Sequence, residues 1–314
     1  MTNILVVYYS QTGQLTRVAR SMMAPLENRP DVKITWQELK PRKPYPYPWP
    51  LLDFLDAFPE SVYMVPPEME PVSFNADSRF DLVILAYQAW FLSPSLPVTG
   101  FLKSEAARAL KGTPVITLIA CRNMWICGQE KVKAQLQSLG AVLIDNVALV
   151  DQGPPLLTFV TTPYWLLTGD KGPWGKVPAA GVGEGDIAAA ARFGRALRDS
   201  LPALKSSPGA SLLWGMGAVK VNPRYIMSEK MARRSFLIWG KLLRAAGEPG
   251  NPLRKVILVV YAVFLITMIL TLVPAGIIVY EILKPFVGKQ LDATVAEMEK
   301  PSGSSTERLA KYAA

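Results

Sequence analysis

Residues 4–20, ILVVYYSQTGQLTRVAR, restrict the possible folds more than any other stretch of the chain. The run Ile4 to Tyr9 predicts a buried parallel strand, because it is continuously apolar rather than alternating. An amphipathic helix follows after a short polar loop. The loop is Ser10-Gln11-Thr12-Gly13-Gln14-Leu15-Thr16. Unpaired N–H groups and the dipole of a helix N-terminus favour an anion, so the loop predicts a phosphate site. Ordinary capping of the helix by Ser10 and Thr12 is the alternative.

The loop fits neither of the two common phosphate motifs, since it lacks G-x-x-x-x-G-K-[ST] and has a single glycine. The pattern S-x-T-G after a first strand resembles the phosphate loop of flavodoxins. That resemblance implies that hydroxyls and N–H groups of residues 10–16 hold the phosphate of FMN without a lysine. The chain departs from the family at Leu15, where flavodoxins that keep T-G-x-T have threonine.

Further strands are predicted at 32–39, 81–87, 113–121 and 141–150, with helices between and after them. This alternation indicates an α/β fold with an open parallel sheet of five strands and helices on both faces. The flavodoxin-like order 2-1-3-4-5 suits it. The predicted domain covers residues 1–202, with insertions at 41–78 and 152–182.

In such sheets a ligand lies beyond the carboxyl ends of the strands, at the switch point between strands 1 and 3. The loops 10–16, 87–97 and 121–128 should converge there. The resemblance to flavodoxins implies that eight residues frame the flavin ring: Tyr87, Gln88, Ala89, Trp90, Cys121, Arg122, Asn123 and Trp125. Trp90 and Trp125 could instead pack in the core, and Arg122 could be a salt-bridged surface residue. No general base is identified, although Tyr87 and Asp151 are candidates.

The two insertions are rich in proline and aromatic residues. A solvent-exposed linker is one interpretation of residues 41–71. We favour an ordered segment that forms a lid or one wall of a substrate site, because Tyr45, Trp49 and Phe54 are too apolar to remain exposed.

The chain has no histidine and two cysteines. This excludes Ser-His and Cys-His catalysis and histidine metal sites, and C-x5-C is not a zinc spacing. No metal site is therefore predicted, and a reducing compartment is the simplest interpretation. The N-terminus leads directly into a strand, so no signal peptide is expected.

The positive charge is concentrated in one segment. Residues 1–200 carry 19 Lys or Arg against 18 Asp or Glu, whereas residues 201–255 carry 10 against 2. The basic segment precedes an uncharged run, residues 256–280, so a membrane surface is the predicted partner rather than nucleic acid.

The uncharged run has 25 residues, enough for a helix that spans a bilayer, which needs about 20. A buried core helix and a re-entrant segment broken at Pro274 to Gly276 are alternatives. The predicted organisation is a basic amphipathic juxtamembrane segment at 203–254, a transmembrane helix at 255–285 and a polar tail at 286–314. Within the first, residues 211–245 would lie in the headgroup region. The positive-inside rule predicts a single pass through the cytoplasmic membrane, with the N-terminal domain cytoplasmic and the tail on the other side, loose beyond Lys300.

Several long strings resemble bacterial flavodoxin-like proteins known as dialkylresorcinol condensing enzymes. They are VVYYSQTGQLT, FPESV, DLVILAYQAWFLSPSLP, FLKSEAARAL, CRNMW and QEKVK. The resemblance covers about residues 1–200 and implies a role in making dialkylresorcinols, with other enzymes of that pathway as partners. Ketosynthase-type condensation is not expected, because it uses a cysteine with histidine partners. Oxidation by FMN of a cyclic dione to an aromatic resorcinol fits the chain better.

The first hypothesis is therefore a membrane-anchored FMN oxidoreductase that acts on a lipidic phenol precursor or cyclic dione. A membrane-tethered electron-transfer flavodoxin or quinone reductase is the second. A cofactor-free flavodoxin-fold scaffold that recruits pathway enzymes is the third.

Overall fold

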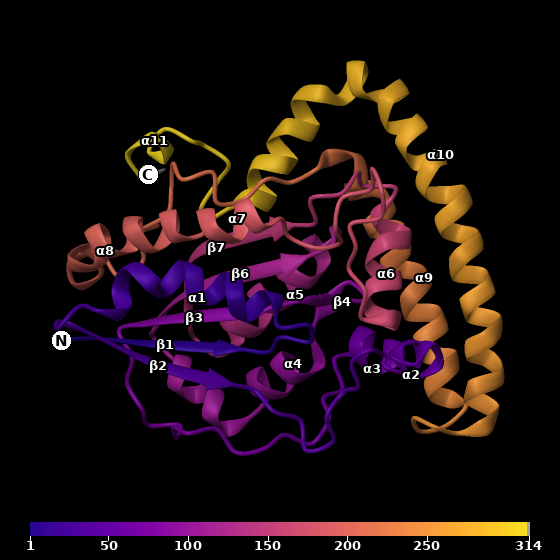
Figure 1. Cartoon of the computed structure of the whole chain (residues 1–314), viewed down its shortest axis with the longest axis horizontal. Helices are drawn as coiled ribbons and strands as arrows, with labels where there is room; N and C mark the ends of the chain where they lie inside the picture. The colour runs from indigo at the N-terminus through magenta and orange to yellow at the C-terminus, as the bar shows by residue number, and fades with distance from the viewer. Residues whose placement is uncertain (313–314) are drawn as a thin grey trace.

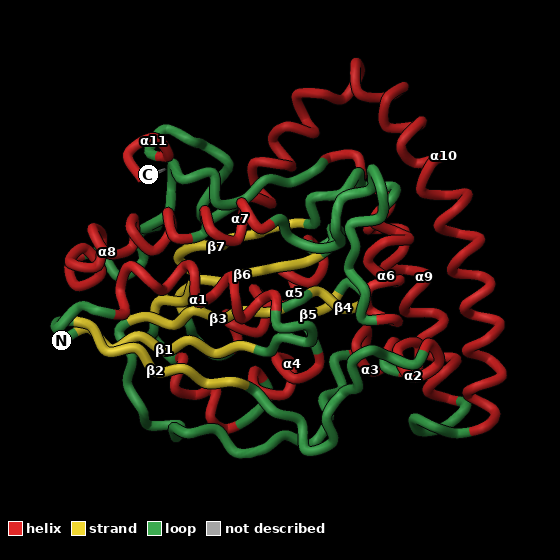
Figure 2. The backbone as a smooth tube through the Cα atoms, viewed as in Figure 1, coloured by secondary structure: helices red, strands yellow, loops and turns green. Residues whose placement is uncertain are grey.

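Five runs of apolar residues form the central sheet of the computed structural model, which describes residues 1–312. The strands are β1 (Thr2–Tyr8), β2 (Val32–Glu38), β3 (Leu82–Tyr87), β6 (Pro114–Cys121) and β7 (Val142–Val150). All neighbours are parallel, in the order β2-β1-β3-β6-β7 (Figure 2). This is the flavodoxin-like order 2-1-3-4-5, so the predicted fold class is confirmed.

Helices cover both faces of the sheet (Figure 1). On one face, α1 (Gln14–Glu27) packs against α7 (Glu184–Ala189) and α8 (Ala191–Ser206). The other face carries α4 (Leu96–Leu102), the 3-10 helix η1 (Glu105–Leu110) and α5 (Ile126–Ser138). The helices α1 and α8 approach closely at Gly194, where a Cβ would lie 1.9 Å from the carbonyl oxygen of Met22.

Both insertions are ordered around aromatic side chains. The first holds α2 (Leu51–Asp56) and α3 (Phe58–Tyr63), and the second holds α6 (Thr158–Thr168). A two-stranded ribbon, β4 (Ala89–Trp90) with β5 (Ser93–Pro94), lies between β3 and α4. The ring of Phe58 is fully buried and stacks on Tyr261 of the C-terminal region at 4.3 Å.

The segment between α8 and the C-terminal helices differs from its prediction. Residues 212–221 do not form an interfacial stretch, because Leu213, Met216 and Val219 are buried in the main core. The backbone there also pairs with the edge of the sheet, with Ala148 N donating to Ala218 O at 3.0 Å. The 3-10 helix η2 (Pro223–Tyr225) and helix α9 (Ile226–Ala245) follow.

Helix α10 (Pro252–Glu299) is longer than the predicted membrane span. Within residues 1–312, its part Pro252–Phe286 is the one helical stretch long and apolar enough to cross a membrane, with a mean hydropathy of 3.0 over an 18-residue window. Figure 1 shows α10 leaving the domain beside α9, bending over at its far end and returning to the domain.

The predicted polar tail does not lie apart from the domain. Residues 286–299 continue α10, and the chain then packs on α8 through α11 (Leu309–Tyr312). Ser302 Oγ donates to buried Asp145 at 2.7 Å, and Arg195 Nη2 donates to Tyr312 O at 2.6 Å. A loose tail on the opposite side of a membrane is therefore wrong for residues 286–312, because its polar atoms pair with groups of the domain. Residues 313–314 lie outside the described part.

Candidate functional site

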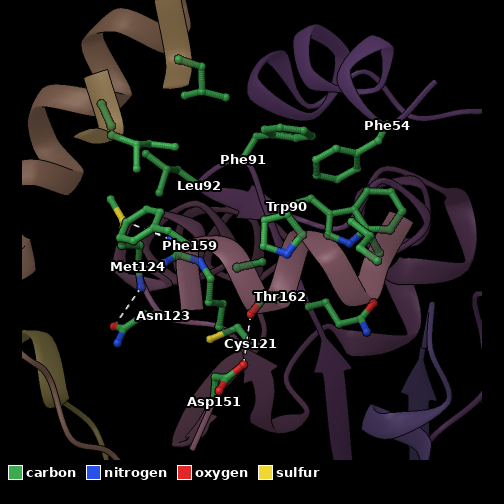
Figure 3. Close-up of a pocket in the computed structure, with 18 of the residues that line it drawn as sticks. Phe54, Trp90, Phe91, Leu92, Cys121, Asn123, Met124, Asp151, Phe159 and Thr162 are labelled. Carbon is green, nitrogen blue, oxygen red and sulfur yellow. Dashed lines mark hydrogen bonds between the residues drawn. The ribbon is translucent and has the colours of Figure 1, made fainter. Parts of the chain in front are cut away.

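A cavity of about 350 Å³ lies beyond the carboxyl ends of β1, β3 and β6. This volume falls within the range of about 300–1,000 Å³ that is usual for small-molecule sites. The loops after all three strands line it, as the flavodoxin-like topology predicts. Figure 3 shows side chains from the loops after β3 and β6 and from both insertions around the same space.

Ten of the fifteen predicted site residues line this cavity. They are Gln11, Thr12, Gln14, Leu15, Gln88, Ala89, Trp90, Cys121, Arg122 and Asn123. The other five, which do not line it, are Ser10, Gly13, Thr16, Tyr87 and Trp125.

The loop before α1 leaves the helix N-terminus open. The N-cap residue is Gly13, which has a left-handed φ of 77° and no side chain with which to cap the helix. The hydroxyls of Ser10 and Thr12 lie 3.4 Å from Thr16 N and 3.5 Å from Gln14 N, at the long limit of hydrogen bonding. Nothing lies within 4 Å of a Cβ built on Gly13. The N–H groups and hydroxyls are thus placed to receive an anion.

Glutamine side chains tie this loop to its surroundings. Gln11 Nε2 donates to Pro46 O of the first insertion at 2.7 Å, and Gln11 N donates to Gln88 Oε1 at 3.2 Å. Gln14 exchanges two hydrogen bonds with the backbone of Val182, at 2.9 and 3.1 Å. Gln14 is therefore a structural clamp between the loop and the second insertion. Leu15 is fully buried, which explains why an apolar residue is accepted there.

The two loops after β3 and β6 contain unusual backbone conformations. Phe91, Leu92 and Met124 have φ values of 47°, 59° and 53°, in the left-handed region that non-glycine residues rarely adopt. All three line the cavity. Strain of this kind costs about 1–3 kcal/mol per residue and tends to gather at functional sites. Among residues 1–312, three of the four non-glycine residues with a left-handed φ therefore line the cavity, and the fourth, Met64, ends α3.

An aromatic wall closes one side of the cavity. The Trp90 ring lies 5.8 Å edge-on from Trp49 of the first insertion and 5.2 Å from Tyr45. The second insertion contributes Phe159 and Trp165 from α6. Both insertions therefore form walls of the site.

Arg122 brings a positive charge into the cavity. Its guanidinium lies 3.8 Å from the ring centroid of Phe159, and its Nη1 lies 3.4 Å from Thr158 Oγ1. Among residues 1–312 no carboxylate forms an ion pair with it. Desolvation lowers the Arg122 pKa to about 10, so the side chain stays charged at neutral pH. It can pair with an anion that enters the site.

The other ionisable groups of the lining are poor catalysts. Burial raises the pKa of the Cys121 thiol well above its usual range, so the thiol is protonated and not a nucleophile. The Asp151 carboxylate accepts from Thr162 Oγ1 at 3.0 Å (Figure 3) and from the backbone N–H of Gly181 and Gly153. Asp151 thereby fixes the second insertion, and its oxygens are engaged.

Two predicted residues have structural roles instead. Tyr87 is fully buried, and its hydroxyl donates to Gln129 Oε1 at 2.5 Å, away from the cavity. Burial raises the pKa of Tyr87 well above its usual value, which also speaks against a basic role. Trp125 is 2% exposed and packs in the main core. Neither of these two side chains therefore lines the cavity.

Sequence analysis missed the far wall of the cavity, which the C-terminal third supplies. Helix α9 contributes Met231 and Phe236, and α10 contributes Phe264, Leu265 and Met268. The cavity thus has a polar end at the loop before α1 and an apolar arm against α9 and α10. The sequence pattern offered no signal for this contact, because an apolar run does not specify what its inner face touches.

Glu229 of α9 is also a missed residue. It is 1% exposed, and its Oε1 accepts from Cys127 N at 2.5 Å, at the N-terminus of α5. Its Oε2 has no hydrogen-bond partner among the described residues. Desolvation raises the Glu229 pKa to about 7. This carboxyl group joins α9 to the N-terminus of α5.

Comparison with known proteins finds similarity in fold. No protein-family model matches the sequence. No curated protein matches it either. A flavoprotein in complex with FMN from Lactobacillus acidophilus NCFM matches at a TM-score of 0.38 and 14% identity, over 47% of this chain and 93% of that one. A putative flavoprotein from Bacteroides eggerthii DSM 20697 matches at a TM-score of 0.38 and 18% identity, over 48% of this chain and 89% of that one. A flavodoxin from the domain Archaea matches at 0.28 and 12%, over 48% and 85%.

Proposed function

We propose that this protein is an FMN-binding oxidoreductase that oxidises a lipidic cyclic dione or related phenol precursor. One observation carries the proposal. A single cavity joins an open helix N-terminus at the flavodoxin-like switch point to an apolar arm against α9 and α10. The polar end suits a phosphate, and the arm suits an alkyl chain.

The residues at the polar end fit FMN. Ser10, Thr12 and the backbone around Gly13 would hold the phosphate, since the two hydroxyls make only long contacts, of 3.4 and 3.5 Å, with N–H groups of the first turn. Gln88 to Trp90 and Arg122 to Asn123 would border the ring, in the two loops that follow β3 and β6. When bound, FMN supplies a two-electron oxidant, and a cyclic dione loses two electrons and two protons as it becomes a resorcinol.

The chain's own residues would prepare the substrate. A 1,3-dione ionises to an enolate, and the unpaired guanidinium of Arg122 can pair with it. Trp49, Trp90 and Phe159 also line the cavity and would shield the substrate from water. The apolar arm would hold the alkyl chain and so direct the polar head toward Arg122.

The resemblance of residues 1–200 to dialkylresorcinol enzymes supports this substrate class. A tethered quinone reductase is the second candidate, because a quinone with an apolar tail would also suit the arm. A cofactor-free scaffold would have no need of the open helix N-terminus. Enzymes of the same pathway are proposed as partners on the resemblance alone.

Anaerobic mixing of the detergent-purified, FMN-loaded protein with a 5-alkyl-cyclohexane-1,3-dione tests the proposal. We expect the flavin absorbance to bleach and the matching alkylresorcinol to form. NAD(P)H alone should leave the spectrum unchanged. Bleaching by NAD(P)H with reoxidation by a quinone, and no reaction with the dione, would establish the second candidate instead.

A further inference from the structure

We propose that α10 is a membrane arch. By this we mean that residues 252–299 enter one leaflet of an anionic bilayer from the side of the sheet domain and return to that side without crossing. This inference goes beyond the proposed function and does not depend on flavin binding.

Both ends of α10 are fixed to the same domain. At its start, Arg254 is fully buried and pairs with Asp56 of α2 at 2.6 Å and with Glu60 of α3 at 2.5 Å. At its end, Glu299 Oε1 accepts from Val221 N at 2.9 Å. Val221 belongs to the segment whose Ala218 O accepts from Ala148 N of β7. Figure 1 shows the two limbs of the helix on either side of the bend.

The returning limb is too short and too polar to cross a membrane. Residues 286–299 would extend about 21 Å as a helix, against about 30 Å for the hydrocarbon core. They include Lys289, Asp292 and Glu297. If the bend lay on the far side of a bilayer, these charges would lie within it. The bend must therefore remain on the near side.

The outer face of α10 is suited to lipid. Its inner face packs on the domain, where Leu258 and Tyr261 are fully buried. Large apolar side chains on the outer face are exposed from Val256 to Phe286, where the exposed fraction reaches 82%. They include Val256, Val259, Val260, Val263, Ile266, Leu270, Ile278, Val279, Ile282, Leu283 and Phe286. Soluble monomers rarely expose a continuous apolar surface of this extent.

The positive charges beside this face indicate that an anionic bilayer covers it. Helix α9 exposes basic residues next to exposed Met227, Ile238 and Leu242. The basic residues are Lys230, Arg233, Arg234, Lys241 and Arg244, and within residues 1–312 none of them forms a salt bridge. Each such charge near an anionic surface contributes about 1 kcal/mol of attraction. A second copy of this chain would bring the same positive charges together.

The arch also explains the position of the apolar arm. Phe264, Leu265 and Met268 line the cavity from α10, while the next residues around the helix face outward. A helix that lies in one leaflet would place the lipid directly behind the wall of the cavity. An alkyl chain would have a short path from the leaflet to the site.

Labelling of single engineered cysteines tests the arch. The two variants are Lys111→Cys, on the exposed surface of the sheet domain, and Lys311→Cys, on the exposed part of the tail. The full chain is bound to vesicles of phosphatidylcholine and phosphatidylglycerol and treated with a membrane-impermeant maleimide, with wild type giving the background from Cys121 and Cys127. We expect equal and complete labelling of both variants. A single pass would place the two sites on opposite sides of the bilayer, so the labelled fractions of the two variants would be complementary. That result would overturn the proposal.

Vesicle binding provides the second measurement. Val263→Glu places a charge on the outer face, and Gln137→Glu adds the same charge to an exposed position on α5. We expect Val263→Glu to lower the vesicle partition coefficient about tenfold or more, and Gln137→Glu to leave it unchanged. If the wild-type protein dimerises in solution and does not bind the vesicles, a second copy covers the outer face and the proposed arch is wrong.

Discussion

At the level of single residues, Gly13 has two functions that can be measured separately. It supplies a left-handed backbone at φ 77°, and it leaves space in front of the helix N-terminus. We expect Gly13→Ala to lower the free energy of unfolding by about 1 kcal/mol and to weaken FMN binding about tenfold. Chemical denaturation and FMN titration measure the two effects.

Gly112 provides the matched control for this change. It has a φ of 71°, and nothing lies within 4 Å of a Cβ built there, but it precedes the opposite end of β6. Gly112→Ala should produce the same loss of stability with unchanged FMN affinity. Equal FMN affinities in the two variants would mean that the loop does not hold the phosphate.

Arg122 should control the affinity for an anionic substrate. Removing its charge in Arg122→Ala should raise the Kd for the dione enolate about tenfold or more, because charge-assisted hydrogen bonds contribute about 1.5–3 kcal/mol. Arg122→Lys should recover part of the affinity. Perturbation of the flavin spectrum measures the Kd. An unchanged Kd in Arg122→Ala would place the substrate head elsewhere.

Glu229 should make stability depend on pH. Desolvation raises its folded-state pKa from 4.5 to about 7, so folding takes up a proton between these values. Its contribution to the free energy of unfolding is therefore full below pH 4.5 and is lost as the pH rises to 7, by about 3 kcal/mol at most. Denaturation at several pH values should show this slope in wild type. Glu229→Gln should abolish it, and persistence of the slope in that variant would assign it to another group.

At the level of elements, the contact of α10 with α2 and α3 depends on one buried cation. Arg254→Ala would leave Asp56 and Glu60 without their partner, so we expect a loss of about 3 kcal/mol in the free energy of unfolding. Lys255→Ala, one residue away and exposed, should have almost no effect. Guanidinium denaturation compares the two. Similar small losses in both would show that other contacts fix the start of α10.

Local patterns predicted the elements of the sheet well. The apolar run at Ile4 to Tyr9 and the amphipathic period of α1 depend on neighbouring residues, and both elements formed close to the expected limits. The three site loops followed from topology alone. Long-range contacts were not predictable in this way. Nothing local to Trp125 indicates that it turns into the core, and nothing in residues 299–312 indicates that they pair with Asp145 and its neighbours.

At the level of the whole molecule, the C-terminal third completes the site instead of merely tethering it. Helices α9 and α10 line the apolar arm, and Glu229 connects α9 to the N-terminus of α5. The insertions close the remaining sides through Trp49 and Phe159. The flavodoxin-like sheet thus provides the polar end of the cavity, and the added segments determine what else can enter it.

The most direct test of the FMN site is the absorption spectrum of the full chain purified in detergent, followed by titration of the flavin-free protein with FMN. We predict flavin absorbance in the purified protein and saturable binding of one FMN per chain, weakened in Gly13→Ala but not in Gly112→Ala. A folded protein that carries no flavin and takes up none on titration would contradict the account.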